Sequence, residues 1–178
     1  GYTENSYDAA FSRGQAIGGY LAEYGFNLDF APVADVNTNP HNTVIGKRAF
    51  STDPVAAAVL VGAFRDGLAE KGIIATFKHF PGHGDTYEDS HYGLAVSYKT
   101  AEDMALCEWL PFQEATDGDF IMTGHIAAPN ITGDQLPATF SHQMITEILK
   151  GQLGFSGLVV TDSMQMGAIT DEYSSADA

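Results

Sequence analysis

The chain has 178 residues, enough for one domain with a sizeable core, and 44% of them are hydrophobic, which is ordinary for a globular protein. Its net charge of −15 argues against nucleic acid or an anionic membrane surface as a partner, because both would repel it. Cys107 is the only cysteine, which excludes an internal disulfide and leaves the compartment undetermined, and the sequence shows neither a signal peptide nor an apolar run that could insert into a membrane.

Helical patterns precede each apolar run of the chain. In the first, over residues 7–24, apolar side chains recur on approximately one face, and Gly25 ends the pattern. The second has Asp53 as N-cap and Pro54 in the first turn, and it ends at Gly72. Both are long enough to cover a sheet.

The third helical pattern begins at Thr100, with Asp103 three residues later, which is a variant of the capping box. We expect Pro111 to break or kink this helix near Trp109, because proline cannot donate a hydrogen bond to the preceding turn. The fourth pattern begins at Ser141 and ends near Gly151 or Gly154.

Strand candidates recur at intervals of roughly 40 to 45 residues, namely Phe26–Val36, Ile73–Phe77, Phe120–Thr123 and Leu158–Thr161. Strands that alternate with helices indicate βα units and a parallel sheet. A complete (β/α)8 barrel needs about 250 residues. The sequence therefore predicts an α/β fold of the TIM (β/α)8 barrel type, with about half of the barrel in residues 1–178. A doubly wound sheet is the alternative, although no Gly-x-Gly-x-x-Gly turn follows any of these strands.

Residues 78–91 form the most informative segment. It reads Lys78-His79-Phe80-Pro81-Gly82-His83-Gly84-Asp85-Thr86-Tyr87-Glu88-Asp89-Ser90-His91. The apolar run before it ends at Pro81 and Gly82, which predicts a strand that leads into a loop. Loops at strand ends are where rigid scaffolds place catalytic groups. The alternative is a solvated surface loop.

Polar side chains lie at or just beyond the ends of all the strand candidates. They are Asp35, Lys78 with His79, His125 and Asp162. Barrels of this kind place their active sites at the C-terminal ends of the strands. These residues are therefore expected to form one site.

A zinc site is the competing interpretation of this cluster. Its possible ligands are His79, His83, Asp85, Asp89 and His91. The spacing from His79 to His83 spans Pro81 and Gly82, so these two histidines cannot lie on one helical face as the zincin motif requires. We therefore predict neither a metal nor a cofactor.

Residues 78–91 resemble the signature of glycoside hydrolase family 3, most closely its bacterial β-N-acetylglucosaminidase (β-hexosaminidase) branch. That branch carries Lys-His-Phe-Pro-Gly-His-Gly-Asp followed by an Asp-Ser-His triplet, here at 89–91. Three further segments resemble the family's nucleophile strand (159–166), a sugar-binding strand (30–37) and the loop after that strand (45–50). The matches extend from about residue 26 to residue 167, so the resemblance implies a single, partial family 3 barrel domain.

The resemblance implies a retaining β-glycosidase that hydrolyses terminal β-N-acetylglucosaminyl residues through a covalent glycosyl-enzyme. It identifies Asp162 as the nucleophile, whereas the alternative is that Asp162 only caps the turn at Ser163. It identifies His91, paired with Asp89, as the acid/base, and a histidine that titrates near neutrality can both donate and accept the proton. Glu88 is the rival acid.

By the same resemblance, the substrate-binding residues are Asp35, Arg48, Lys78 and His79. His125, at the end of the third strand candidate, is expected to line the same pocket, with no role assigned to it. Charged groups suit this task because their hydrogen bonds to hydroxyl groups are stronger than neutral ones. The alternatives are a surface ion pair for Arg48 and a turn-forming role for Asp35.

Other functions remain open at this point. A β-glucosidase, a xylosidase or a phosphorolytic enzyme would be a relative of the same family, and an inactive barrel fragment or a carbohydrate-binding module would belong to another class. The isolated chain is expected to be weakly active or inactive and to self-associate through exposed barrel edges. The loop from Gly82 to Tyr92 is expected to be mobile. Neither the natural glycan nor the choice between bacterial cytoplasm and secretion follows from the sequence.

Overall fold

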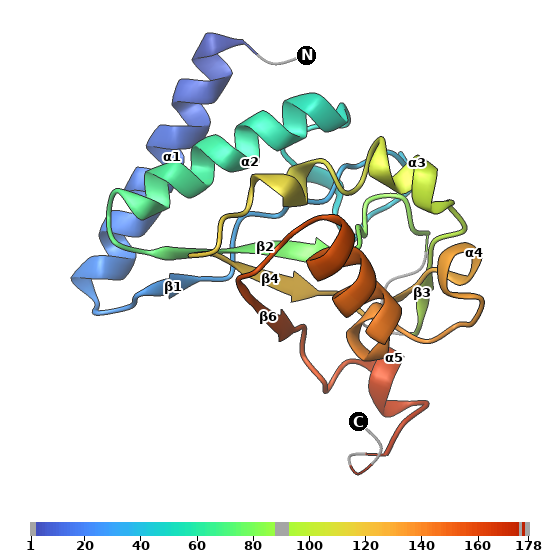
Figure 1. Cartoon of the computed structure of the whole chain (residues 1–178). Coiled ribbons are helices and arrows are strands. Elements are labelled where there is room, and N and C mark those ends of the chain that lie inside the picture. The colour runs from blue at the N-terminus through green and yellow to red at the C-terminus, as the bar shows by residue number, and fades with distance from the viewer. Residues whose placement is uncertain (1–2, 88–92, 175, 177–178) are drawn as a thin grey trace.

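The computed structural model of this chain describes residues 3–87, 93–174 and 176. Its main feature is a parallel sheet of four strands, in the order β1 (Leu28–Asp29), β2 (Ile74–Phe80), β4 (Phe120–Thr123) and β6 (Leu158–Thr161) (Figure 1). The strands join the sheet in chain order, as in the wall of a barrel, whereas a doubly wound sheet reverses its order at a switch point. The predicted α/β fold of TIM-barrel type is confirmed, and the described residues supply half of the strands of a (β/α)8 barrel.

Two long helices, α1 (Glu4–Glu23) and α2 (Pro54–Ala69), cover one face of this sheet (Figure 1). The side chain of Thr3 caps α1, and Asp53 Oδ1 accepts a hydrogen bond from Ala56 N at 2.7 Å to cap α2. Each cap satisfies a backbone N–H that has no partner within its helix. The N-cap predicted at Asp53 is therefore confirmed.

The helices α1 and α2 cross where both carry glycine. A Cβ atom added to Gly14 would lie 2.1 Å from the carbonyl oxygen of Phe64, and one added to Gly67 would lie 2.2 Å from that of Phe11. Real Cβ atoms do not approach other atoms so closely, so the two backbones touch here. This contact fixes α1 against α2, with α1 beside β1 and α2 beside β2.

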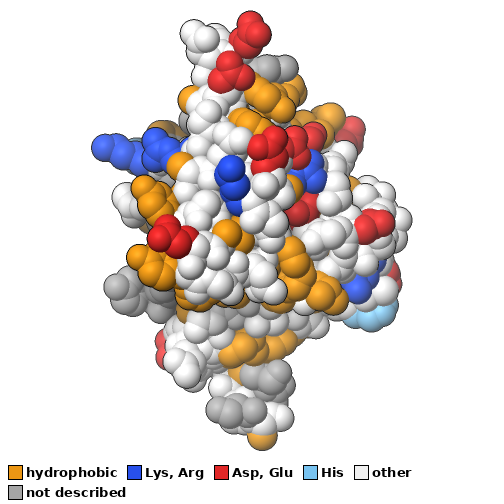
Figure 2. Space-filling view, turned by 90° about the vertical axis from the view of Figure 1, so that its left-hand side faces the viewer, with side chains coloured by type: hydrophobic (Ala, Val, Ile, Leu, Met, Phe, Trp, Pro, Cys, Tyr) orange, Lys and Arg blue, Asp and Glu red, His pale blue; other side chains and the backbone are white. Residues whose placement is uncertain are grey.

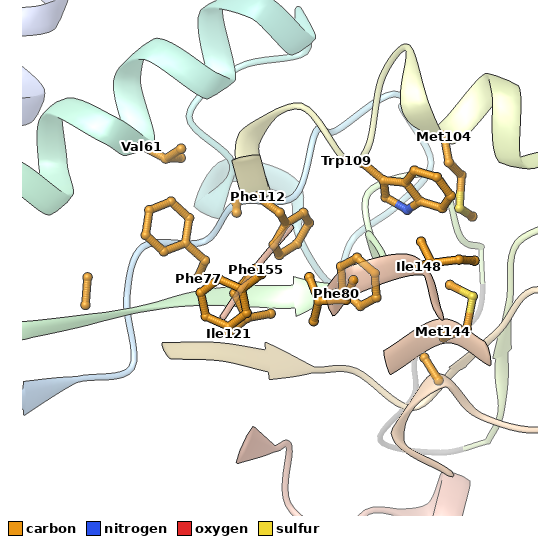
Figure 3. Close-up of a cluster of buried hydrophobic side chains, with 14 of the residues drawn as sticks. Val61, Phe77, Phe80, Met104, Trp109, Phe112, Ile121, Met144, Ile148 and Phe155 are labelled. Atoms are coloured by element: carbon orange, nitrogen blue, oxygen red, sulfur yellow. The ribbon is translucent and has the colours of Figure 1, made fainter. Parts of the chain in front are cut away.

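The hydrophobic core lies between the sheet, α2 and the segments of residues 104–112 and 144–155 (Figure 3). Phe77 of β2 and Ile121 of β4 are fully buried beside Val61 of α2. The rings of Phe80 and Phe112 meet edge to face, 5.4 Å apart at 90°. Burial of such side chains is the main stabilising term, worth about 1.5–3 kcal/mol for each.

On the opposite face of the sheet, the described residues leave β6 partly uncovered. Val159 packs against the core, so its neighbour Leu158 points to the other side of β6, where 62% of its surface is exposed. Figure 2 views another side of the molecule, the end of the sheet at the left of Figure 1 where β2 begins, and shows hydrophobic side chains at the surface there, among carboxylates. In a closed barrel, the inward side of such strands is filled by side chains from the other strands.

The third helix is shorter than the sequence predicted. The capping box of Thr100 and Asp103 is present, but α3 (Ala101–Ala105) ends well before Pro111. The chain leaves the helix early, and Trp109 N donates to Met104 O at 2.9 Å while Trp109 enters the core, where it is fully buried. Pro111 instead begins a 3-10 turn, η2 (Pro111–Glu114).

The remaining elements are short, apart from η4. A second parallel pair, β3 (Ala95–Val96) with β5 (Ile126–Ala127), was not expected from the sequence. The others are η1 (Gly46–Arg48), α4 (Pro129–Thr132), η3 (Ala138–Phe140), the π-type helix η4 (Gln143–Gln152) and α5 (Gly167–Thr170). Among the described residues, no helix combines the length and apolar character needed to cross a membrane.

Candidate active site

A pocket of about 460 Å³ lies at the C-terminal ends of β2, β4 and β6. Its lining residues are Phe30, Arg48, Lys78, His79, Met122, Thr161, Asp162 and Ser163. The predicted residues Arg48, Lys78, His79 and Asp162 are therefore brought together, at the end of the sheet where barrels place their active sites.

The strand β2 supplies two consecutive residues to this pocket. Neighbouring side chains of a regular strand point to opposite faces. The register between β2 and β4 shifts between Lys78 and Phe80, and such an irregularity re-aims side chains next to active sites. As a result, Lys78 and His79 both line the pocket.

Asp162 follows directly on β6. Its N–H donates to Thr123 O at 2.9 Å, and its Oδ1 accepts from Ser163 N at 2.7 Å. Its Oδ2 lies 3.8 Å from His79 Nε2, and the side chain is 24% exposed. The turn-capping bond considered as an alternative role is therefore present, and it orients the carboxylate so that Oδ2 faces His79 in the pocket.

His79 is held from behind by Asp35. The Asp35 side chain has no exposed surface, and it accepts hydrogen bonds from His79 Nδ1 at 2.8 Å and from His83 N at 2.7 Å. An ionised carboxylate can only accept, so Nδ1 of His79 carries a proton and the orientation of the ring is fixed. In this geometry Asp35 supports His79 and the loop, and its expected contact with sugar hydroxyls stays a prediction.

Lys78 and Arg48 give the pocket its positive charge. Burial lowers the pKa of Lys78, and the charge of Arg48 lowers it further, while the nearby carboxylates of Asp162, Asp29 and Asp35 act in the opposite direction. Arg48 is exposed, and its Nη1 donates to Val44 O at 3.3 Å. Cations beside a carboxylate suit a ligand rich in hydroxyl groups.

His125 lies behind the pocket and does not line it. The residue is fully buried, with Nδ1 2.9 Å from Thr139 Oγ1 and Nε2 2.9 Å from Ser163 O. A carbonyl only accepts, so Nε2 carries the proton that bonds the turn after Asp162. The expected position of His125 in the pocket lining is corrected on this point, because both ring nitrogens have partners in the protein interior.

The loop after β2 is well anchored at its beginning. Residues 82–86 are buried, apart from the half-buried Asp85, and Asn42 Nδ2 donates to His83 O at 2.6 Å and to Thr86 O at 3.0 Å. The mobility expected of the loop from Gly82 to Tyr92 stays a prediction, and these contacts favour a fixed position for residues 82–86. The predicted acid/base pair of Asp89 and His91 and the rival Glu88 lie outside the described residues.

Several supporting residues were missed by the sequence analysis. They are Asn42, Lys99, Glu108 and Thr139. Asn42 bonds to the backbone of the loop, Lys99 bonds to Asp85 of the loop and to Glu108, and Thr139 bonds to His125. Only Glu108 carried a signal that could have been noticed, since it is a charged residue inside the run Cys107-Glu108-Trp109-Leu110. Buried charges of this kind are normally paired.

The described residues contain no group of three or more His, Cys, Asp or Glu that could hold a metal ion. His79 and His83 lie edge to face with ring centres 6.0 Å apart, and His79 Nδ1 is bonded to Asp35. The zinc interpretation therefore has no support in this part of the chain. Two of its five candidate ligands, Asp89 and His91, lie in the range 88–92 that the structure does not describe.

Comparison with known proteins relates the chain to one family. Residues 2–178 match the model described as "Glycosyl hydrolase family 3 N terminal domain". The chain is 39% identical over 176 residues to the protein named Beta-hexosaminidase A of Pseudoalteromonas piscicida. The aligned region covers 92% of this chain and 29% of that protein.

Solved structures agree with this match. A glycoside hydrolase family 3 β-N-acetylglucosaminidase from Paenibacillus sp. str. FPU-7 superposes with a TM-score of 0.91 at 40% identity, over 94% of this chain and 32% of that one. A β-glucoside phosphorylase, BglX bound to 2FGlc, gives a TM-score of 0.88 at 27% identity, over 93% of this chain and 32% of that one. The chain thus spans 29% to 32% of the length of these three proteins.

Proposed function

Because this chain belongs to glycoside hydrolase family 3, we propose that it carries the catalytic site of a retaining β-glycosidase that removes terminal β-N-acetylglucosaminyl residues. The observation that carries this proposal is the carboxylate of Asp162, held at the end of β6 in a pocket with Lys78, Arg48 and His79. The choice of sugar is supported by the names of the relatives, a β-hexosaminidase and a β-N-acetylglucosaminidase.

In the first step, the carboxylate of Asp162 attacks the anomeric carbon and the bond to the leaving oxygen breaks. The bond from Ser163 N, at 2.7 Å, fixes Oδ1 and so directs Oδ2 into the pocket. His91, as the imidazolium, donates a proton to the departing oxygen. Asp89 orients that ring and stabilises its charge, as the carboxylate does in other Asp-His pairs.

In the second step, water attacks the anomeric carbon of the glycosyl-enzyme, and the bond to Asp162 breaks. The neutral ring of His91 takes the proton of the attacking water and returns to the imidazolium form, ready for the next cycle. Lys78, Arg48 and His79 hold the sugar through both steps. Two displacements at one carbon preserve its configuration.

The change Asp162→Asn tests the nucleophile. In the full-length gene product, turnover of a nitrophenyl N-acetyl-β-glucosaminide should fall by about a thousandfold or more, because an amide cannot form the ester intermediate. Binding of N-acetylglucosamine, measured by calorimetry, should stay within about threefold, since the side chain keeps its shape.

The matched control is Asp8→Asn, which removes an exposed carboxylate from α1 that is not among the residues lining the pocket. It should leave turnover unchanged. A loss of less than about tenfold in Asp162→Asn would contradict the nucleophile assignment, because a covalent catalyst lowers the barrier by several kcal/mol. A similar loss in both variants would contradict it as well.

Phosphorolysis is a second candidate, favoured by the likeness to the β-glucoside phosphorylase at 27% identity. Phosphate would replace water in the second step, and a neutral histidine would repel phosphate less than a carboxylate acid/base does. The products formed with and without phosphate separate the two reactions, with sulfate as the control for ionic strength. A sugar 1-phosphate indicates phosphorolysis, and free sugar in both samples indicates hydrolysis.

The remaining alternatives give different outcomes in the same assays. Faster turnover of a nitrophenyl glucoside or xyloside than of the N-acetylglucosaminide would assign the site to a β-glucosidase or xylosidase. Sugar binding without turnover of any of these substrates would indicate a binding module or an inactive barrel.

A further inference from the structure

A buried ion pair lies beside the loop that follows β2. Lys99 Nζ donates to Glu108 Oε1 at 2.5 Å, and it lies 3.5 Å from Asp85 Oδ1. Glu108 is fully buried, and the side chains of Lys99 and Asp85 are 24% and 29% exposed. These three residues, called the anchor network below, connect the segment before α3, the segment after α3 and the loop itself.

The anchor network is in direct contact with the backbone of the loop. Gly82 has a φ of +130°, and a Cβ atom added there would lie 2.7 Å from both Cβ and Cγ of Glu108. Asp85 also accepts from Thr38 Oγ1 at 3.3 Å, on the segment that follows Asp35. The loop therefore packs between Glu108 on one side and the segment containing Asp35 on the other.

The inner side of the same short segment is tied to the pocket. His83 N donates to Asp35 Oδ1 at 2.7 Å, and Asp35 in turn holds His79. Residues 82–86 are thus fixed by the pocket on one side and by the anchor network on the other. Residues 88–92 follow this fixed segment in the chain, after Tyr87.

Stability is a poor explanation for the anchor network. A buried ion pair loses its hydration, and it is often no more stabilising than apolar residues of the same size. Glu108 Oε2 is buried with no hydrogen-bond partner among the described residues, so the desolvation of this carboxylate is only partly offset. A directional contact that fixes one geometry explains the arrangement better.

We propose that the anchor network of Lys99, Glu108 and Asp85 is a positioning device for the acid/base of the reaction. This inference rests on the proposed function, because it takes the acid/base to lie on the loop, at His91 with Asp89. An extended chain spans at most about 3.6 Å per residue, so the four residues from Asp85 to Asp89 can span at most about 14 Å. Fixing Asp85 therefore limits where the pair can reach, and an error of about 1 Å in a catalytic group can cost a hundredfold in rate.

The test uses chemistry that bypasses the acid/base. A dinitrophenyl N-acetyl-β-glucosaminide has so good a leaving group that its departure needs no proton, and water attack on the glycosyl-enzyme then limits turnover. Azide attacks the anomeric carbon without a base, breaks the bond to Asp162 and gives a glycosyl azide. Added azide therefore restores turnover only where loss of the base was the defect.

The variants are Lys99→Met, Glu108→Gln and Asp85→Asn in the full-length gene product, with Arg65→Met as the matched control. Arg65 forms another partly buried ion pair, 3.3 Å from Asp119, between α2 and the beginning of β4. Thermal melts show which variants fold. Asp85→Asn, at the most exposed member, replaces Lys99→Met if the latter does not fold.

We expect Lys99→Met to lower turnover by about tenfold to a hundredfold and azide to restore it to within about threefold of the unmodified enzyme with azide. Glu108→Gln should lose less, because the amide oxygen still accepts from Lys99. Any loss in Arg65→Met should not respond to azide. A loss in Lys99→Met that azide does not relieve, or no loss at all, overturns the proposal.

His91→Ala, measured in parallel, separates this proposal from the proposed function. If azide fails to restore His91→Ala but restores Glu88→Gln, the acid/base was misassigned, and rescue of Lys99→Met would still show that the anchor network positions the loop. If azide restores His91→Ala and not Lys99→Met, the acid/base assignment stands and the positioning role is wrong.

Discussion

At the scale of single residues, Cys107 shows how the interior changes the chemistry of a side chain. Burial raises the pKa of its thiol from 9.0 to about 11, and the neighbouring charge of Glu108 adds to this effect. A rise of about two pKa units lowers the thiolate fraction at pH 8 about a hundredfold, and the thiolate is the reactive form. Iodoacetamide should therefore modify the folded chain at least about tenfold more slowly than the chain unfolded in urea, as followed by mass spectrometry.

The direction of the pH dependence provides a second check. Alkylation of the folded chain should still accelerate between pH 9 and pH 10, where the unfolded chain levels off near its ordinary thiol pKa. Equal rates for the folded and unfolded chains at pH 8 would contradict the raised pKa.

The candidate site was predictable where position along a strand decides the role. Lys78, His79 and Asp162 stand at the ends of strands, and the parallel sheet brings them together. Asp35 and His125 also stand near strand ends, but each is buried and bonded to other parts of the chain, at His83 and at Ser163. Sequence gives the type of a polar side chain and not its partner, so their supporting roles could not be foreseen.

At the scale of elements, the crossing of α1 and α2 depends on the absence of a side chain at Gly14. Alanine there would push its methyl group against the Phe64 carbonyl, at 2.1 Å, and force the helices apart. We expect Gly14→Ala to lower the free energy of unfolding by about 1–3 kcal/mol, the usual cost of overpacking. Urea denaturation followed by circular dichroism measures this change.

Gly19→Ala is the matched control on the same helix, because a Cβ atom at Gly19 would meet nothing within 4 Å. It should raise the free energy of unfolding by about 0.5–1 kcal/mol, since alanine loses less entropy than glycine in a helix. Equal effects of the two changes would show that helix propensity, and not the crossing, decides the result.

The elements themselves were predictable in proportion to their length and periodicity. Both β4 and β6 have the bounds that their apolar runs predict. The run from Phe26 to Val36 gives only a two-residue β1, because Pro32 has no N–H for the ladder and Val33 keeps a single bridge to Lys78. The two-residue strands β3 and β5 are too short for any periodicity to show.

At the scale of the whole molecule, the uncovered face of the sheet predicts self-association of the isolated chain. The strands leave apolar side chains such as Leu158, 62% exposed, without a packing partner among the described residues, and open strand edges invite pairing. Sedimentation velocity should show dimers or larger species. Higher salt should favour them, because it screens the repulsion between chains of net charge −15.

Leu158→Lys should shift this equilibrium toward monomer, because it places a charge on the uncovered face. Leu106→Lys makes the same change at another exposed leucine, 70% exposed and adjacent to α3. It should leave the sedimentation profile unchanged. A monomeric unmodified chain at all salt concentrations, or equal effects of both changes, would contradict the prediction.

The two ends of the parallel sheet differ in function, so a label can be attached at the end opposite the pocket. The pocket lies at one end, and the turn of residues 116–119 lies at the other, where Asp119 accepts from Thr116 N at 2.8 Å and exposed Asp117 faces water. Loops at the N-terminal ends of barrel strands contribute to stability more than to chemistry. A fluorophore or a bead coupled through a cysteine placed at Asp117 would therefore present the pocket outward, toward the sugar in solution, on every immobilised copy.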